Sequence, residues 1–74
     1  MTYMLIFQLL SGDVAEMTVT EKQCRETLEL AAYAGGVSIK LSGGKQEIVP
    51  AWRVACVRRT DETVGFGVMQ VRRF

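Results

Sequence analysis

The sequence predicts an α+β fold with the element order ββαβββ, in which one helix packs on one face of a mostly antiparallel sheet. Several short runs alternate apolar and polar residues between turn residues, which is typical of half-buried strands. One longer run has helical spacing and ends at two glycines. We expect one domain, residues 1–74, whose sheet either curls toward a partial barrel or is covered by a second copy.

The apolar run from Tyr3 to Leu10 is predicted to be the central strand. It contains no charge and one strongly polar residue, Gln8. Apolar residues fill odd and even positions alike, as is typical of a strand buried on both faces. Ser11-Gly12-Asp13 then indicates a tight turn, and the alternating run Val14–Val19 completes a hairpin.

Thr20 is predicted to cap the single helix, because Gln23 lies three residues on, as a capping box requires. The helix is expected to end near Ala34, where Gly35-Gly36 can adopt the left-handed conformation of a C-cap. Small side chains dominate the face that the wheel assigns to the core: Cys24, Thr27, Leu28 and Ala31. Such a face can lie close against a sheet.

Two further hairpins are predicted after the helix. Val37–Leu41 and a returning strand at 46–49 flank a glycine-containing turn, and Pro50 must interrupt the second strand because it lacks a backbone donor. Trp52–Thr60 and Val64–Arg72 are predicted to form the last hairpin, paired symmetrically about the turn at 60–63.

That symmetric pairing separates the last hairpin into two faces. Trp52, Val54 and Cys56 fall on the face assigned to the core. The opposite face has an apolar middle with arginines at its ends, and the pairing brings Arg53 near Arg72.

Charge and cysteine content limit the possible settings. The net charge is +1, which argues against binding nucleic acid by charge alone, although residues 51–74 contain five arginines and only two acids. Cys24 and Cys56 both fall on predicted core faces, and we expect them to be free, buried thiols in a reducing, cytoplasmic compartment. No signal peptide or membrane span is predicted.

The residue types exclude several kinds of catalysis. The chain has no histidine, which removes Ser-His-Asp and Cys-His mechanisms and the commonest transition-metal ligand. Its glycine-lysine turn lacks the spacing of a phosphate-binding loop. The paired acids fall in a predicted turn or on the wet face of the helix. We therefore expect a protein that is not an enzyme and has no cofactor or metal site.

The arginines of the last hairpin are the leading candidates for a binding site. Arginine beside exposed aromatic rings suits a protein hot spot and also single-stranded nucleic acid. Three interpretations stay open: a protein contact, a nucleic-acid contact, or arginines that only solubilise the hairpin edge. The candidate partner-binding residues are Arg53, Phe66, Arg72, Arg73, Arg58, Arg59 and Tyr33. Tyr3, Trp52 and Phe74 could add stacking surface.

Tyr33 and Leu30 are large residues that lie off the main helix stripe, so they are either ordinary surface or a contact with a partner or second subunit.

In size and general make-up the chain resembles the short orphan proteins of phages and prophages, a group that includes inhibitors of host defence such as anti-CRISPR proteins. The resemblance covers the whole chain and rests on no specific motif. It implies a phage or prophage accessory role. We expect a small interaction protein that docks on a protein partner and also forms a homodimer; a nucleic-acid-binding module is the alternative.

Overall fold

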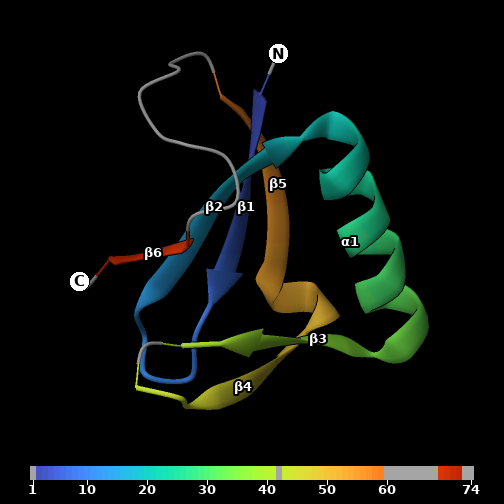
Figure 1. Cartoon of the computed structure of the whole chain (residues 1–74). Coiled ribbons are helices and arrows are strands. Elements are labelled where there is room, and N and C mark those ends of the chain that lie inside the picture. The colour runs from blue at the N-terminus through green and yellow to red at the C-terminus, as the bar shows by residue number, and fades with distance from the viewer. Residues whose placement is uncertain (1, 42, 60–68, 73–74) are drawn as a thin grey trace.

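The computed structural model describes residues 2–41, 43–59 and 69–72, and it has the predicted α+β architecture (Figure 1). In chain order the elements are β1 (Thr2–Gln8), β2 (Val14–Thr20), α1 (Glu21–Ala34), β3 (Gly36–Lys40), β4 (Gln46–Pro50), the 3₁₀ helix η1 (Ala51–Arg53), β5 (Val54–Arg59) and β6 (Met69–Arg72). All the strand pairs among these described residues are antiparallel. No helix among the described residues is long and apolar enough to cross a membrane.

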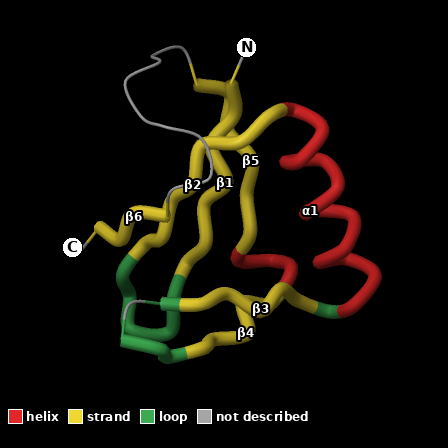
Figure 2. Tube along the Cα trace, viewed as in Figure 1, coloured by secondary structure: helices red, strands yellow, loops and turns green. Residues whose placement is uncertain are grey.

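The strands form two separate sheets. One has the order β5-β1-β2-β6, and the other consists of β3 and β4 alone (Figure 2). The predicted central strand, Tyr3–Leu10, is confirmed as β1, which spans Thr2–Gln8 and pairs with β2 along one edge and with β5 along the other. The expected burial of both faces is wrong, because Met4 and Ile6 on the other face are only half-buried. The described strands do not close into a barrel.

One face of the four-stranded sheet builds the core. Leu5 and Phe7 of β1 are almost completely buried, and across the sheet they lie opposite β2 and β5 residues of the same face. This inner face is packed by α1, which contacts β1, β2 and β5. The β3–β4 hairpin adds Ile39 and Val49 to the same core cluster. The other face of the sheet, called the outer face below, has no described helix or strand against it (Figure 1).

The helix begins and ends as predicted. The backbone N–H of Gln23 donates to the Thr20 hydroxyl at 3.1 Å, and the Gln23 side chain accepts from the Thr20 N–H at 3.0 Å, which completes a capping box. Gly35 follows with φ of 81°, a left-handed conformation that glycine adopts without steric cost. The small side chains of Cys24 and Ala31 are buried beneath the helix.

The expectation of two free cysteines is wrong. Cys24 of α1 and Cys56 of β5 form a disulfide, with Cα atoms 6.0 Å apart. Both residues were correctly assigned to core faces. Because the narrow, small-residue face of α1 lies close to β5, these two core faces meet, and the sulfur atoms come within bonding distance.

The predicted last hairpin is also wrong. β5 and β6 occupy opposite edges of the four-stranded sheet and do not pair with each other. The alternation assigned inner and outer faces correctly, because Val54 is buried while Ala55 and Val57 are exposed. Face alternation does not reveal which strand is the neighbour, and β5 pairs with the free edge of β1. The predicted turn at 60–63 lies outside the described residues.

Trp52 was predicted to be a core strand residue, and this is wrong too. Pro50 ends β4, and Ala51–Arg53 form η1 before the chain resumes as β5. This turn breaks the period-two alternation that placed Trp52 on the face of Val54. Its side chain is instead 76% exposed.

We expect reduction of the Cys24–Cys56 disulfide to destabilise the protein strongly. The cross-link joins residues 32 positions apart. In the chain-entropy treatment, closing a loop of this length lowers the entropy of the unfolded chain and so raises the free energy of unfolding by about 4 kcal/mol. This is a large share of the stability of a small domain. Urea denaturation with and without a phosphine reductant measures the difference.

The matched control for reduction is the Cys24→Ala, Cys56→Ala double variant, whose stability should not respond to the reductant. An unchanged urea midpoint for the reduced wild-type protein would show that the disulfide does not stabilise the fold.

Thr20→Ala should lower the free energy of unfolding by about 1 kcal/mol, because it removes the hydroxyl that caps the Gln23 N–H. Thermal unfolding followed by circular dichroism measures this loss. Thr20→Ser retains the hydroxyl and is the control; equal stability of the alanine and serine variants would contradict the capping role.

Candidate functional site

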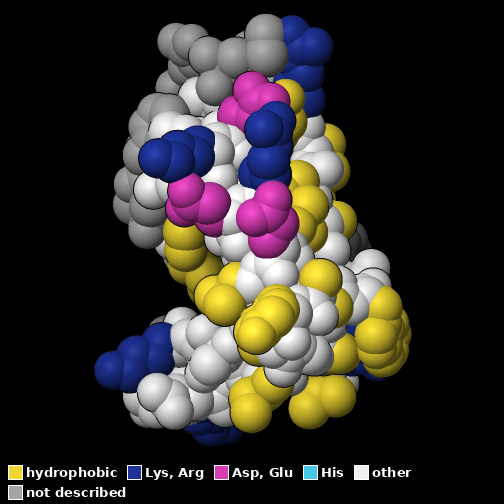
Figure 3. All heavy atoms as spheres, turned by 90° about the vertical axis from the view of Figure 1, so that its right-hand side faces the viewer, with side chains coloured by type: hydrophobic (Ala, Val, Ile, Leu, Met, Phe, Trp, Pro, Cys, Tyr) yellow, Lys and Arg dark blue, Asp and Glu magenta, His cyan; other side chains and the backbone are white. Residues whose placement is uncertain are grey.

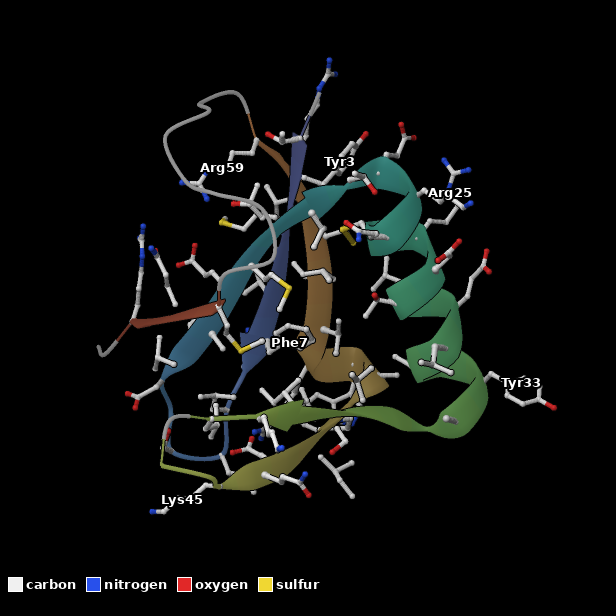
Figure 4. All side chains as sticks on the ribbon, viewed as in Figure 1. Tyr3, Phe7, Arg25, Tyr33, Lys45 and Arg59 are labelled. Carbon is white, nitrogen blue, oxygen red and sulfur yellow. A yellow bond between two sulfur atoms is a disulfide. The ribbon has the colours of Figure 1, made fainter. Side chains whose placement is uncertain are left out.

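Large apolar side chains are exposed where α1 ends and η1 passes. Tyr33 is 93% exposed and Leu30 58% exposed on the last turns of α1, and Trp52 projects from η1, which contacts α1. Figure 3 shows hydrophobic side chains gathered over the lower half of this side of the molecule. Tyr33 points away from the body of the protein (Figure 4). We call Leu30, Tyr33 and Trp52 the docking patch.

An arginine borders the docking patch at η1. The Arg53 guanidinium lies over the ring of Trp52, with its central carbon 4.6 Å from the ring centroid. A cation over an indole face is attracted to the ring's negative quadrupole, and the contact restrains both side chains. Arg53 is thus one predicted site residue that the structure places beside exposed apolar surface.

The opposite margin of the docking patch is acidic. Glu26 and Glu29 lie one helical turn before Leu30 and Tyr33, so each acid is the neighbour of one patch residue. The first turns of α1 carry two exposed ion pairs, Arg25 with Glu21 at 2.9 Å and Lys22 with Glu26 at 3.9 Å. The exposed side of α1 therefore changes from charged to apolar along its length, as Figure 3 shows.

The predicted arginines do not form one cluster. Arg53 and Arg72 lie at the same end of the four-stranded sheet but on opposite edges, separated by β1 and β2. Three strand spacings put their backbones about 14 Å apart. Arg58 and Arg59 lie at the other end of the sheet, opposite Tyr3 and Thr2. The expected adjacency of Arg53 and Arg72 depended on the last hairpin and is wrong.

Two of the arginines have contacts across the outer face of the sheet. The Arg72 Nε donates to Glu16 Oε1 at 2.9 Å, and the Glu16 side chain is only 12% exposed. The Arg59 Nη1 reaches the Met4 sulfur at 3.3 Å and the Thr18 hydroxyl at 3.5 Å. These contacts tie the edge strands β6 and β5 to the two central strands, so both arginines have structural roles.

Of the remaining predicted residues, the structure places Tyr3 and Arg58 and leaves the others outside its described part. Tyr3 is half-buried and packs against the core cluster. Phe66, Arg73 and Phe74 lie outside the described residues. Arg58 is exposed at the end of β5. Of the predicted partner-binding residues, Arg53 and Tyr33 therefore lie at or beside the docking patch. Trp52 lies there too, because η1 interrupts the strand alternation after Pro50. Pro50 is the sequence signal that could have predicted this interruption.

A cleft of about 640 Å³ lies between the β1–β2 turn, the β3–β4 hairpin and β6. Its lining mixes apolar side chains with a few charged ones: Leu9, Ser11, Asp13, Leu41, Lys45, Glu47, Met69 and Val71. The Glu47 carboxylate accepts the Leu10 backbone N–H at 2.9 Å, which links β4 to the turn after β1. This hydrogen bond gives Glu47 a structural role in the cleft wall.

No protein-family model matches this chain, and no curated protein or solved structure is significantly similar to it. Function therefore has to be argued from the residues and their placement.

The Arg72–Glu16 ion pair should be measurable as a coupling energy. We expect about 0.5–1 kcal/mol between the two side chains, the upper part of the range for partly exposed pairs, because Glu16 is mostly covered. Urea denaturation of Arg72→Ala, Glu16→Ala and the double variant gives this value. Strictly additive effects would contradict an energetic coupling. A charge reversal at Arg72 would also disturb this pair, so it is a poor probe of binding.

Proposed function

We propose that this protein is a non-catalytic docking module that binds a protein partner through the docking patch and Arg53. The single observation that supports the proposal most is the exposure of Tyr33 and of Trp52, whose ring is in contact with the Arg53 guanidinium. Trp, Tyr and Arg are the residue types most enriched among binding hot spots. Burying an exposed aromatic ring at an interface is favourable, because it removes a large apolar surface from water.

The charges around the patch define the chemistry of the partner. The partner's contact surface is apolar at its centre, with recesses for two aromatic rings. It carries a carboxylate opposite Arg53 and a basic group opposite Glu26 and Glu29. Such charges at the rim select the partner and its orientation more than they add affinity. The central contribution comes from burial of Tyr33 and Trp52.

A nucleic-acid-binding module remains the alternative from the same arginines. It is supported by the exposed Arg58 and by the basic composition of residues 51–74. The described arginines of this basic segment are divided between two ends and two edges of the sheet, and Arg72 is paired with an acid. The acidic margin of the docking patch also repels phosphate. These features favour a protein partner.

The biological setting is a further part of the proposal. A role as a phage or prophage accessory protein, including an inhibitor of host defence, is compatible with docking alone. We predicted a cytoplasmic location from the assumption of free thiols. The Cys24–Cys56 disulfide argues against a permanently reducing environment, because cystines persist mainly in oxidising compartments.

Substitution of the docking patch should abolish partner binding without unfolding the domain. A photo-reactive phenylalanine analogue at position 33 would first cross-link the partner in the native host, and the purified pair would then be titrated calorimetrically. We expect Tyr33→Ala and Trp52→Ala each to weaken binding at least tenfold, the loss of about 1.4 kcal/mol that is usual for a hot spot.

Val57→Ala is the matched control, since Val57 is an exposed apolar residue on the outer face and away from the patch. Equal affinity of Tyr33→Ala, Trp52→Ala and Val57→Ala would overturn the proposal. Binding of an oligonucleotide whose logarithmic affinity falls steeply with the logarithm of salt concentration would favour the nucleic-acid alternative instead.

A further inference from the structure

The outer edge of β4 is a second unpartnered feature, separate from the docking patch. Among the described strands, only β3 pairs with β4. Next to the turn, the Leu41 N–H donates to the Lys45 carbonyl at 2.7 Å, which identifies a hydrogen-bonded pair. Antiparallel pairs alternate between bonded and non-bonded, so Ile48, opposite Ser38, is in a non-bonded pair. Its N–H and C=O therefore point away from β3.

The edge of β4 is short and ends at Pro50, but within the strand it lacks the exposed charged side chain that other described edge strands carry. Natural edge strands are commonly protected by charged side chains, which discourage pairing with another chain. Exposed charged residues occur on β3 (Lys40), β5 (Arg58) and β6 (Arg72). β4 instead exposes Ile48 at its centre, 72% accessible. The one charge of β4 is the carboxylate of Glu47, which turns toward the Leu10 N–H.

We infer that two copies of this chain join edge to edge through β4, antiparallel about a twofold axis at Ile48. Each two-stranded sheet then becomes half of a four-stranded sheet. In this register Ile48 lies opposite Ile48 of the second copy, and its outward N–H and C=O form two hydrogen bonds across the axis. The inference goes beyond the proposed docking function and uses a different surface.

The residues of β4 favour a second copy as the occupant of this edge. The five-residue strand is its own complement: Gln46 lies opposite Pro50 of the second copy, and Glu47 opposite Val49. No like charges therefore face each other across the axis. Pro50 has no N–H and ends the ladder at both ends of the pairing. The β3–β4 hairpin already packs Ile39 and Val49 into the core, and pairing with a second copy extends its hydrogen-bonded ladder from two strands to four.

A short shared edge predicts a weak dimer. Five residues per chain bury less than the roughly 800 Å² per partner of a standard interface. We therefore expect a dissociation constant on the order of 10 μM, so that monomer and dimer exchange within an accessible concentration range. Sedimentation equilibrium or light scattering from a few micromolar to a few hundred micromolar follows this equilibrium.

A matched pair of lysine variants tests the interface. Ser38 and Ile48 lie opposite each other on the outward face of the same hairpin, but only Ile48 lies on the proposed axis. Ile48→Lys should weaken dimerisation at least tenfold by placing two like charges together, whereas Ser38→Lys should leave it unchanged. Ile48→Pro removes the outward N–H and retains the bonds to β3, and it should also give a monomer.

Cysteine cross-linking tests the register. In a bonded antiparallel pair, Cα atoms lie about 5.5 Å apart, within the range of a disulfide. Ile48→Cys should therefore form an intermolecular disulfide under mild oxidation with glutathione. Ser38→Cys should not, because its counterpart lies three strand spacings away, about 14 Å. Circular dichroism would confirm that each variant is folded.

Three outcomes would overturn this inference: a monomeric wild-type protein at several hundred micromolar, a folded Ile48→Lys variant that dimerises like the wild type, or equal cross-linking of the two cysteine variants. Tyr33→Ala distinguishes the two surfaces. It should leave the dimer intact, and loss of the dimer in that variant would assign self-association to the docking patch and overturn the pairing through β4.

Discussion

The pairing of β1 along both of its edges is the constraint on which the rest of this structure depends. An uncharged strand gains most when both edges are hydrogen-bonded and one face is completely buried. β2 occupies one edge through a five-residue turn, and β5 occupies the other after a long excursion through α1 and the β3–β4 hairpin. Once both edges are used, β6 has to join an outer edge of the sheet, and it pairs with the outer edge of β2 and not with that of β5.

The close packing of α1 on the sheet is a second constraint on the structure. α1 presents small side chains to the sheet and can therefore approach it closely, which brings Cys24 within bonding distance of Cys56. A chain of 74 residues buries a limited apolar area, and domains of this size commonly rely on cross-links or on association. The Cys24–Cys56 disulfide is such a cross-link, and it joins α1 to the sheet. The stability of the protein therefore depends on the redox state of its surroundings.

Four of the large apolar side chains left outside that core lie on two surfaces, and Leu10, Val57 and Val71 are exposed elsewhere. The docking patch lies at the end of α1 and on η1, between an acidic and a basic margin. The β4 edge displays Ile48 and unpaired backbone groups, without a charged residue directed at it. The arginines, which dominate the end of the sequence, are partly engaged in holding the sheet edges. The exposed aromatic residues thus support the proposed binding function more than the basic composition does.

Local patterns in the sequence determined the fold class, the central strand and the limits of the helix. They succeeded because capping, glycine conformations and face alternation act over a few residues, as the Thr20–Gln23 capping box and Gly35 show. The position of Tyr33 outside the buried face of the helix was predicted in the same way, from its place on the helical wheel.

Only the tertiary structure decided strand neighbours, the disulfide and the exposure of Trp52. Alternation is identical whether β5 pairs with β6 or with β1, so it cannot choose between them. The contact of Cys24 with Cys56 depends on where α1 lies on the sheet, and the position of Trp52 depends on the turn after Pro50. The strand neighbours and the disulfide are relations between segments distant in sequence. The exposure of Trp52 results from a local break in periodicity. The pattern within one periodic run contains neither kind of information.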